Sequence, residues 1–311
     1  MTNPIRPPRL QPGMTIGIVA PSSGIRDARL SAGIAAIEKR GYHVRLADHL
    51  FDQHGYLAGA DAARGADLSR MFADPAVHAV LCGRGGYGAV RILDHIDWAA
   101  IAANPKPFIG YSDITTLHLA IERHAPMVTF HGPVLTTLGG GLTPAAESAF
   151  WSVLERDEPL GLCDTEGAGA KTLVSGRAEG RLAGGCLALL SAAAGTPEAP
   201  DFAGRIVLIE DVGERVYRVD RMLMQLLRAG QLQRAAGFVI GTVTGWDEKE
   251  TCEPPITLDR VWRDYIVPLG KPAVTGFPIG HEPNPMTLPL GCLARLDADA
   301  GTIEILESAV R

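Results

Sequence analysis

Ser112 stands where a short apolar strand meets a helix, a position that can turn a serine into a nucleophile. The run Phe108–Gly110 follows a proline and suits a buried strand, and apolar residues return at helical spacing after Ser112. A sharp turn here would expose the hydroxyl, and the N–H groups at the helix start would favour a developing oxyanion. The alternative is an ordinary helix N-cap, the commonest role of a serine at such a place. The sequence also departs from G-x-S-x-G, because Ile114 replaces the second glycine.

An acid and a base that could serve this serine stand in the second half of the chain. Glu210 ends an apolar run that begins at Ile206, where a carboxylate is costly unless it is solvated or paired. His281 lies in a loop stiffened by glycine and proline, and an imidazole with a pKa of about 6.5 suits a general base. Ser112, Glu210 and His281 could form a triad in the chain order of the α/β-hydrolases. The alternatives are a strand-end carboxylate facing water and an exposed loop histidine.

A glycine-rich segment, Gly83 to Gly88, follows an apolar run and fits G-x-G-x-x-G. Three interpretations stay open. The segment could bind a dinucleotide, although that fingerprint normally follows the first strand of its domain. It could be a tight turn that needs positive φ. Its bare backbone N–H groups could also face a substrate as half of an oxyanion hole.

Composition narrows the class of protein. The chain has 311 residues, 46% hydrophobic and 21% charged, which suits a globular protein of two domains. The net charge of -6 argues against nucleic acid and against an anionic membrane surface as partners. Five scattered cysteines predict a reducing compartment, and no spacing predicts a metal site. We find no signal-peptide pattern and no apolar run of about 18 residues, and we expect a cytoplasmic protein.

The first half of the chain alternates between strands and helices, which predicts a parallel sheet with its site at the carboxyl ends of the strands. The loops 20–24, 83–88 and 110–113 would lie there. The expected strands are 14–20, 43–47, 77–82, 108–110 and 127–130, and the expected helices are 27–40, 60–72, 86–94, 97–103, 113–124 and 144–155.

The second half is richer in strands and alternates less regularly, which predicts a separate mixed α/β domain. We expect domains at 1–158 and 172–311, joined by a linker at 159–171. The expected strands are 173–179, 205–211, 238–243, 273–277, 293–296 and 302–306, and the expected helices are 187–194 and 217–227.

Several motifs in order between Val19 and His281 resemble the LD-carboxypeptidases, serine peptidases of the muramoyltetrapeptide carboxypeptidase type. The matching segments are Val19-Ala20-Pro21-Ser22-Ser23, Arg84 to Leu93, Gly110-Tyr111-Ser112-Asp113-Ile114-Thr115, Gly195-Thr196-Pro197, Glu210 to Tyr217, Asp220-Arg221-Met222-Leu223 and Gly280-His281.

The resemblance implies a flavodoxin-like parallel-sheet N-terminal domain and a smaller β-rich C-terminal domain, with the site in the cleft between them. It implies Ser112 as nucleophile, His281 as general base and Glu210 as the acid that orients it. The backbone N–H groups of Asp113 and of Gly86 or its neighbour Gly85 would form the oxyanion hole.

The activity implied is release of the terminal D-alanine from murein tetrapeptides in cell-wall recycling, by a cytoplasmic homodimer that uses no cofactor and no metal. Arg84 and Arg215 adjoin the site loops and could bind the substrate carboxylate, or could be solvated or paired. A sister branch cleaves a peptide–nucleotide amide in microcin C, and a non-catalytic nucleotide-binding module is a further alternative. One departure is Cys186, where the family often has asparagine. It puts a hydrogen bond at the start of the next helix in doubt.

Overall fold

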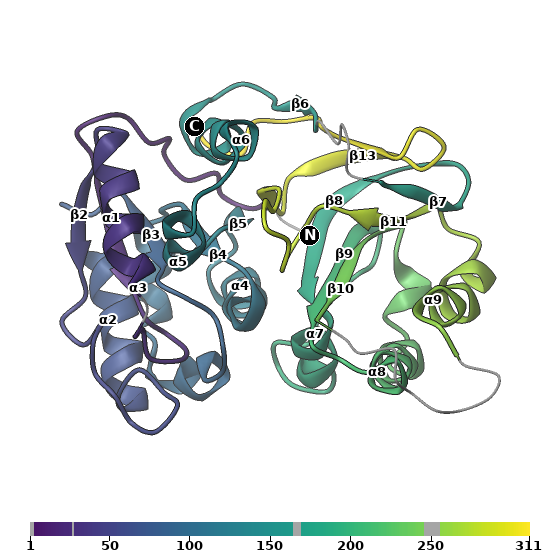
Figure 1. Cartoon of the computed structure of the whole chain (residues 1–311), viewed down its shortest axis with the longest axis horizontal. Helices are drawn as coiled ribbons and strands as arrows, with labels where there is room; N and C mark the ends of the chain where they lie inside the picture. The colour runs from purple at the N-terminus through teal and green to yellow at the C-terminus, as the bar shows by residue number, and fades with distance from the viewer. Residues whose placement is uncertain (1–2, 27, 164–168, 246–255) are drawn as a thin grey trace. The chain divides into compact units, whose positions relative to one another are not determined.

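The computed structural model describes residues 3–26, 28–163, 169–245 and 256–311, which form two compact units (Figure 1). The first unit holds Met1–Pro159 together with two later segments, Met286–Gly291 and Ser308–Arg311. The second unit holds Leu160–Pro285 and Cys292–Glu307. The chain therefore returns twice to its first unit. The domains expected from the sequence, 1–158 and 172–311 joined by a linker at 159–171, contain only one passage between units.

The first unit contains a six-stranded sheet in the order β12-β5-β4-β3-β1-β2. Five of its strands are parallel, in the flavodoxin order 2-1-3-4-5, so the parallel-sheet prediction is confirmed. The sixth, β12, comes from the late segment, was not predicted, and pairs antiparallel with β5. The strands are β1 Thr15–Val19, β2 His43–Leu46, β3 Ala79–Cys82, β4 Phe108–Gly110, β5 Thr129–His131 and β12 Leu288–Leu290.

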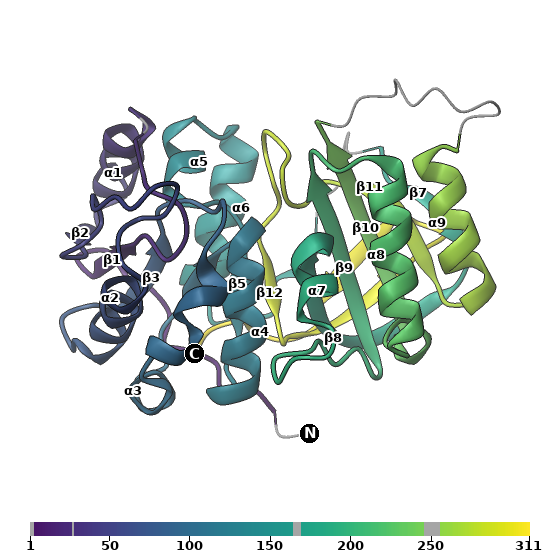
Figure 2. The same ribbon diagram turned by 90° about the horizontal axis from the view of Figure 1, so that it is seen from below.

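Helices cover both faces of this sheet, with α1 beside α5 on one face and α2, α3 and α4 on the other (Figure 2). The segment expected as a helix over 86–94 forms only a 3-10 helix, η1, which begins at Ala89. Gly86 and Gly88 have φ of 113° and 128°, which no right-handed helix contains. The helices are α1 Arg29–Lys39, α2 Asp61–Ala73, η1 Ala89–His95, α3 Trp98–Ala103, η2 Ser112–Ile114, α4 Thr115–His124, α5 Leu135–Gly139 and α6 Pro144–Glu155.

The second unit contains an eight-stranded mixed sheet in the order β6-β14-β13-β8-β9-β10-β11-β7. Strands β8 to β11 are parallel and the outer pairings are antiparallel, which confirms the predicted mixed domain. The strands are β6 Gly161–Leu162, β7 Lys171–Val174, β8 Arg177–Cys186, β9 Arg205–Val212, β10 Gly237–Thr244, β11 Ala273–Phe277, β13 Leu293–Asp297 and β14 Thr302–Ile305.

The segment 173–179, expected as one strand, is two strands in different places in this sheet. Gly176, with φ of 121°, lies between β7 at one edge and β8 near the centre. Within the expected linker, β6 pairs with β14, and residues 164–168 lie outside the described part of the chain. The helices are α7 Leu187–Ala193, α8 Val216–Arg228, η3 Leu232–Arg234, α9 Leu258–Ile266 and η4 Val267–Leu269.

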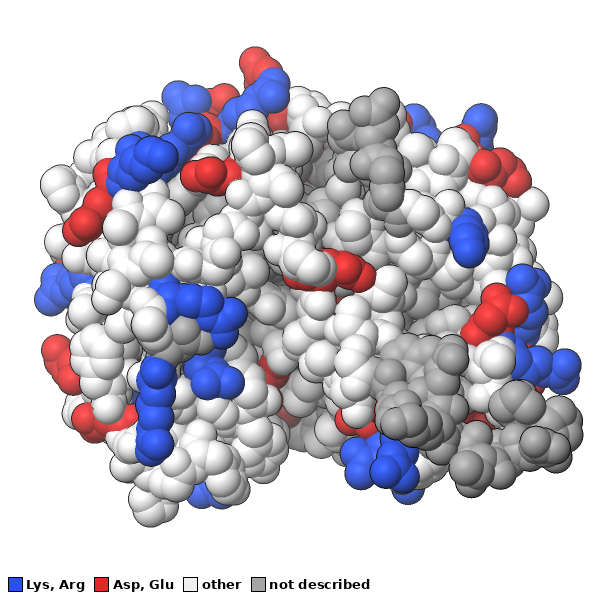
Figure 3. Space-filling model, in the orientation of Figure 1, with Lys and Arg blue, Asp and Glu red and all other residues white. Residues whose placement is uncertain are grey.

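Over the described residues, acidic and basic side chains are interspersed on the face seen in Figure 3, in keeping with the modest net charge. No helix within those residues has both the length and the apolar character needed to cross a membrane. The four cysteines placed by the structure, Cys82, Cys163, Cys186 and Cys292, are not in disulfides.

Candidate active site

Ser112 begins η2 directly after β4, at the sharp turn that the sequence predicted. Its φ is 66°, and it is the one non-glycine residue with positive φ among the residues the structure describes. Such a conformation costs on the order of 1–3 kcal/mol and is concentrated at functional sites. A plain N-cap needs no such strain, because N-cap residues have β-region backbone. The local geometry is therefore that of a nucleophile elbow.

Ile114 explains why this elbow lacks the second glycine of G-x-S-x-G. Ile114 is fully buried, and its Cγ2 lies 2.8 Å from where a Cβ on Gly110 would be. The first glycine of the motif therefore makes room for the isoleucine. The bulky side chain packs under the turn, and the elbow keeps its shape without a second glycine.

A buried histidine that the sequence reading missed supports the same turn. His118 of α4 contacts the Gly110 carbonyl through Nε2 and the Thr129 hydroxyl through Nδ1, both at 2.9 Å. A carbonyl only accepts, so Nε2 carries the proton and Nδ1 accepts from Thr129. Burial lowers the pKa of His118 to about 4. The imidazole is thus neutral at pH 7 and fixes the end of β4 to β5.

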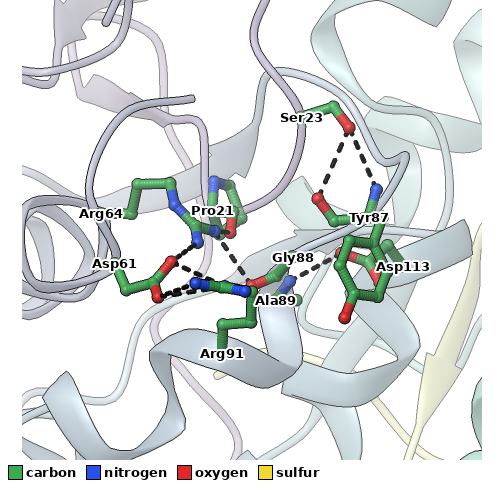
Figure 4. A network of polar contacts seen from close by, with 9 residues as sticks. All are labelled: Pro21, Ser23, Asp61, Arg64, Tyr87, Gly88, Ala89, Arg91 and Asp113. Atoms are coloured by element: carbon green, nitrogen blue, oxygen red, sulfur yellow. Dashed lines mark hydrogen bonds and ion pairs between the residues drawn. The ribbon is translucent and has the colours of Figure 1, made fainter. Parts of the chain in front are cut away.

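The glycine-rich segment lies against the elbow, as its interpretation as half of an oxyanion hole requires. A Cβ on Gly85 would come within 2.8 Å of Ser112 Cβ and 3.1 Å of Ser112 Oγ. The next residue, Gly86, packs against Ser23, whose hydroxyl accepts from Tyr87 N–H at 3.1 Å (Figure 4). The first unit thus brings together Ser112, the glycines Gly85 and Gly86, and Ser23 from three loops at the carboxyl ends of its strands.

Asp113 follows the serine and is almost completely buried. Its Oδ2 accepts from the N–H of Ala89 at 2.8 Å. Burial raises the pKa of Asp113, while Ser22, Ala89 N–H and Arg64 oppose that rise. The side chain therefore ties the elbow to the far end of the glycine-rich segment.

Glu210 and His281 meet in the second unit. His281 Nδ1 lies 2.7 Å from Glu210 Oε2, and Glu210 lies two residues before the end of β9 with 1% exposure. Because a carboxylate accepts, Nδ1 carries the proton and Nε2 is the basic nitrogen of the ring. This is the arrangement in which an acid fixes the tautomer of a catalytic histidine.

The loop that carries His281 is anchored to the neighbouring strand β10. Thr242 donates to Glu282, and Thr244 Oγ1 donates to the His281 carbonyl at 3.3 Å. Gly280 has φ of 80° and leaves room for the carboxyl group of Glu210, which any Cβ there would overlap. The sequence reading noted the stiffness of this loop but not the threonines.

Asp211 and Cys186 have structural contacts. Asp211 Oδ2 accepts from Ala188 N–H at 2.9 Å at the start of α7, and Cys186 Sγ contacts Oδ1 at 3.5 Å. Burial raises the pKa of Asp211 to about 6, partly offset by the N–H of Val212. Burial also raises the pKa of the Cys186 thiol, which disfavours the reactive thiolate. Asp211 therefore supplies a hydrogen bond at the start of α7, where Cys186 replaces the asparagine that the family often has.

The two arginines proposed for the substrate carboxylate lie in different units. Arg84 is partly exposed in the glycine-rich segment and donates to the Gly24 carbonyl at 3.3 Å. Arg215 is exposed just before α8. Among the described residues, no group of three or more His, Cys, Asp and Glu side chains could hold a metal ion.

Arg64, which contacts the glycine-rich segment, could have been identified as a buried charge from its position in the sequence. It lies four residues before Leu68 and eight before Phe72, on the buried side of α2. A charged residue on an apolar helical stripe is expensive unless it is paired, so the spacing alone marks it.

Comparison with known proteins covers both units. Family models of the LD-carboxypeptidase N-terminal and C-terminal domains match residues 16–132 and 179–296. A putative carboxypeptidase of Streptomyces coelicolor is 42% identical over 97% of this chain and 96% of its own. A murein tetrapeptide carboxypeptidase of Pseudomonas aeruginosa is 33% identical over 91% of this chain and 93% of its own.

Solved structures agree on the fold. The crystal structure of muramoyltetrapeptide carboxypeptidase from Oxalobacter formigenes is 31% identical, with a TM-score of 0.81 over 94% of this chain and 98% of its own. The microcin C7 self-immunity protein MccF, at 24% identity, has a TM-score of 0.90 over 99% of this chain and 100% of its own, a likeness of fold alone. The chain therefore belongs to the LD-carboxypeptidase family of serine peptidases, as its motifs predicted.

Proposed function

We propose that this enzyme hydrolyses the L,D-amide bond that releases the terminal D-alanine from murein tetrapeptides, by way of an acyl-enzyme on Ser112. The names of the Pseudomonas and Oxalobacter relatives support the substrate. The 2.7 Å contact between Glu210 and His281 carries the mechanism, because it leaves a basic Nε2 on the histidine. The left-handed φ of Ser112 is the second support.

In this mechanism His281 Nε2 takes the proton of Ser112 Oγ as the oxygen attacks the carbonyl carbon of the residue before D-alanine. Glu210 holds the imidazole in the correct tautomer and stabilises the imidazolium that forms. The N–H groups of Asp113 and of Gly86 or Gly85 donate to the oxyanion. The oxyanion then collapses, the C–N bond breaks, and His281 protonates the departing amine of D-alanine.

A water molecule then attacks the acyl-enzyme with His281 again as base, and the shortened peptide leaves with a new carboxylate. Binding of the D-alanine carboxylate needs a cation, and we propose Arg84 or Arg215 for it. Replacement of the correct arginine by methionine should raise KM for the tetrapeptide far more than it lowers kcat, because the contact is present before and during the reaction.

The direct test is release of D-alanine from a murein tetrapeptide, followed by mass spectrometry. Ser112→Ala should lower kcat by about 10⁴-fold or more. The matched control is Ser152→Ala, a partly buried serine in α6 of the same unit, which should leave the rate unchanged. Full activity of Ser112→Ala, or full inhibition by a chelator, would refute the serine mechanism.

A second substrate separates this proposal from its alternatives. An aminoacyl-sulfamoyl adenosine tests peptide–nucleotide amide cleavage. Faster turnover of that compound than of the tetrapeptide would assign the chain to the other specificity. Binding of adenosine nucleotides without turnover of either compound would instead favour a nucleotide-binding module built on residues 83–88.

We also propose that the protein acts in the cytoplasm as a homodimer, which the family resemblance implies. Light scattering coupled to size exclusion measures the mass directly. A mass equal to that of one 33.0 kDa chain across the working concentration range would contradict the dimer. Fractionation of cells that express the tagged protein tests the compartment.

A further inference from the structure

The peptide group between Gly88 and Ala89 is held at both of its ends by buried, oppositely charged side chains. Its carbonyl accepts from Arg64 Nη1 at 3.0 Å, and its N–H donates to Asp113 Oδ2 at 2.8 Å (Figure 4). Arg64 is 2% exposed and Asp113 is 1% exposed. The Gly88 carbonyl also accepts from the backbone N–H of Arg91 at 3.1 Å. Because water has little access to Arg64 or Asp113, their contacts act with this backbone bond to set the orientation of the peptide plane.

The guanidinium of Arg64 joins three separate segments of the first unit. Besides Gly88, it donates to the Pro21 carbonyl and pairs with Asp61 at the start of α2. Asp61 in turn accepts from Arg91 of η1 through both oxygens, at 2.8–3.1 Å. A buried guanidinium is tolerated only with such partners, so the network is held together as a unit.

The charges are placed to suit the peptide dipole. The cation lies at the carbonyl oxygen and the anion lies at the N–H, so each favours the same orientation of the group. Gly88 itself has φ of 128°, and a Cβ there would come within 2.5 Å of Leu57 and 3.1 Å of Arg64 Nη1. Only glycine fits at position 88. Because glycine has great conformational freedom, its backbone needs contacts from other residues to hold one conformation.

We propose that Arg64 is a positioning residue for the reaction: by clamping the Gly88–Ala89 peptide against Asp113, it holds Gly85 and Gly86 at Ser112. This inference rests on the proposed function, because it assumes that these glycines donate to the oxyanion. Gly85 lies so close to Ser112 that a Cβ on it would clash with the serine, and the clamp lies three residues further along the same segment. Asp113 belongs both to the elbow and to the clamp. One residue therefore fixes the position of the elbow N–H relative to the N–H groups of Gly85 and Gly86.

Arg64→Met tests the clamp, since methionine fills much of the volume but donates no hydrogen bond. Arg70→Met is the matched control. Arg70 lies on the same helix and also pairs with an aspartate three residues earlier, but it is exposed. We expect Arg64→Met to lower kcat for the tetrapeptide by about 10²-fold, the typical effect of a misplacement of about 1 Å, and KM to change little. Arg70→Met should match the wild type.

Arg64→Lys measures how much of the effect comes from the forked geometry. Lysine keeps the charge but cannot donate to two carbonyls and a carboxylate in one plane. We expect it to recover about one order of magnitude of kcat relative to Arg64→Met. If Arg64→Met fails to fold, as judged by circular dichroism, Arg64→Lys decides the question, with a kcat about tenfold below the wild type expected.

A readout that needs no natural substrate separates failure of this inference from failure of the proposed function. Phosphonylation of Ser112 by a fluorophosphonate passes through an oxyanion, and its rate should fall in Arg64→Met as kcat does.

A folded Arg64→Met with wild-type phosphonylation and kcat would overturn the clamp while leaving the serine mechanism intact. Absence of D-alanine release by the wild type, with phosphonylation still dependent on Arg64, would overturn only the substrate. An equal loss in Arg70→Met would show a general effect of the helix and would also overturn the clamp.

Discussion

Gly280 packs directly against the carboxyl group of Glu210, so that a side chain on Gly280 would occupy the space of Glu210 Oε2. The same oxygen accepts from His281 Nδ1 at 2.7 Å. The glycine before the histidine therefore makes the acid–base pair sterically possible.

Gly280→Ala should separate Glu210 from His281, because the new methyl group overlaps the carboxylate and φ of 80° disfavours alanine. We expect kcat to fall by about 10²-fold or more, as when a catalytic group is misplaced by about 1 Å. Gly270→Ala is the matched control. Gly270 has φ of 63° in the same unit, and a Cβ there would meet nothing within 4 Å. That variant should lose about 1 kcal/mol of stability and keep its kcat. Equal losses of activity in both variants would contradict the steric explanation.

Glu210→Gln should leave the fold intact and remove most of the activity. The glutamine can present its NH₂ group to Nδ1 and stabilise the wrong tautomer, and it cannot stabilise an imidazolium. In the corresponding acid-to-amide change of a serine protease the loss is about 10⁴-fold in kcat, and we expect a similar scale here. The control is Glu214→Gln, an acid four residues later that pairs with Arg218 near the surface. A Glu210→Gln rate within tenfold of the wild type would exclude Glu210 as the orienting acid.

The sequence held enough information for the sheet of the first unit and for the turn at Ser112, because both depend on local patterns. Apolar runs and helical spacing predicted the five parallel strands, and the turn after Gly110 marked Ser112. The return of Leu288–Leu290 to that sheet could not be predicted, since three residues pairing with a strand more than 150 positions earlier leave no local pattern.

Local strain and long-range pairing account for what else was missed. The positive φ of Gly86 and Gly88 cut short a segment whose apolar spacing resembles a helix. Asp211 bonds the start of α7, which precedes it by some twenty residues, because β8 and β9 are neighbours in the sheet. Arg64 was predictable in principle, since a charge on the apolar stripe of a helix indicates a buried pair.

Ser112→Gly should be more stable than Ser112→Ala, although both lack the nucleophile. At φ of 66° any Cβ is strained, and only glycine relieves it, by about 1 kcal/mol. Ser152 in α6 is the matched control, where alanine should be the more stable by about 1 kcal/mol because the backbone is helical. Urea denaturation of the four variants measures both differences. The same sign at both positions would show that Ser112 is not strained in solution.

Acid should weaken the support of the elbow through His118. Burial lowers its pKa in the folded state to about 4, against 6.5 in the unfolded chain, so the unfolded state binds the extra proton between these values. The free energy of unfolding should therefore fall as the pH drops from 6.5 to 4, with a total contribution of about 3 kcal/mol. His118→Gln, which can still donate to the Gly110 carbonyl, should lack this pH-dependent contribution to the free energy of unfolding. Urea denaturation at each pH gives the difference in free energy of unfolding between wild type and variant. In this difference the contributions of other titrating groups cancel, including that of Asp211, whose raised pKa acts in the opposite direction. A difference that stays constant with pH would mean that His118 is not neutral and buried beneath the elbow.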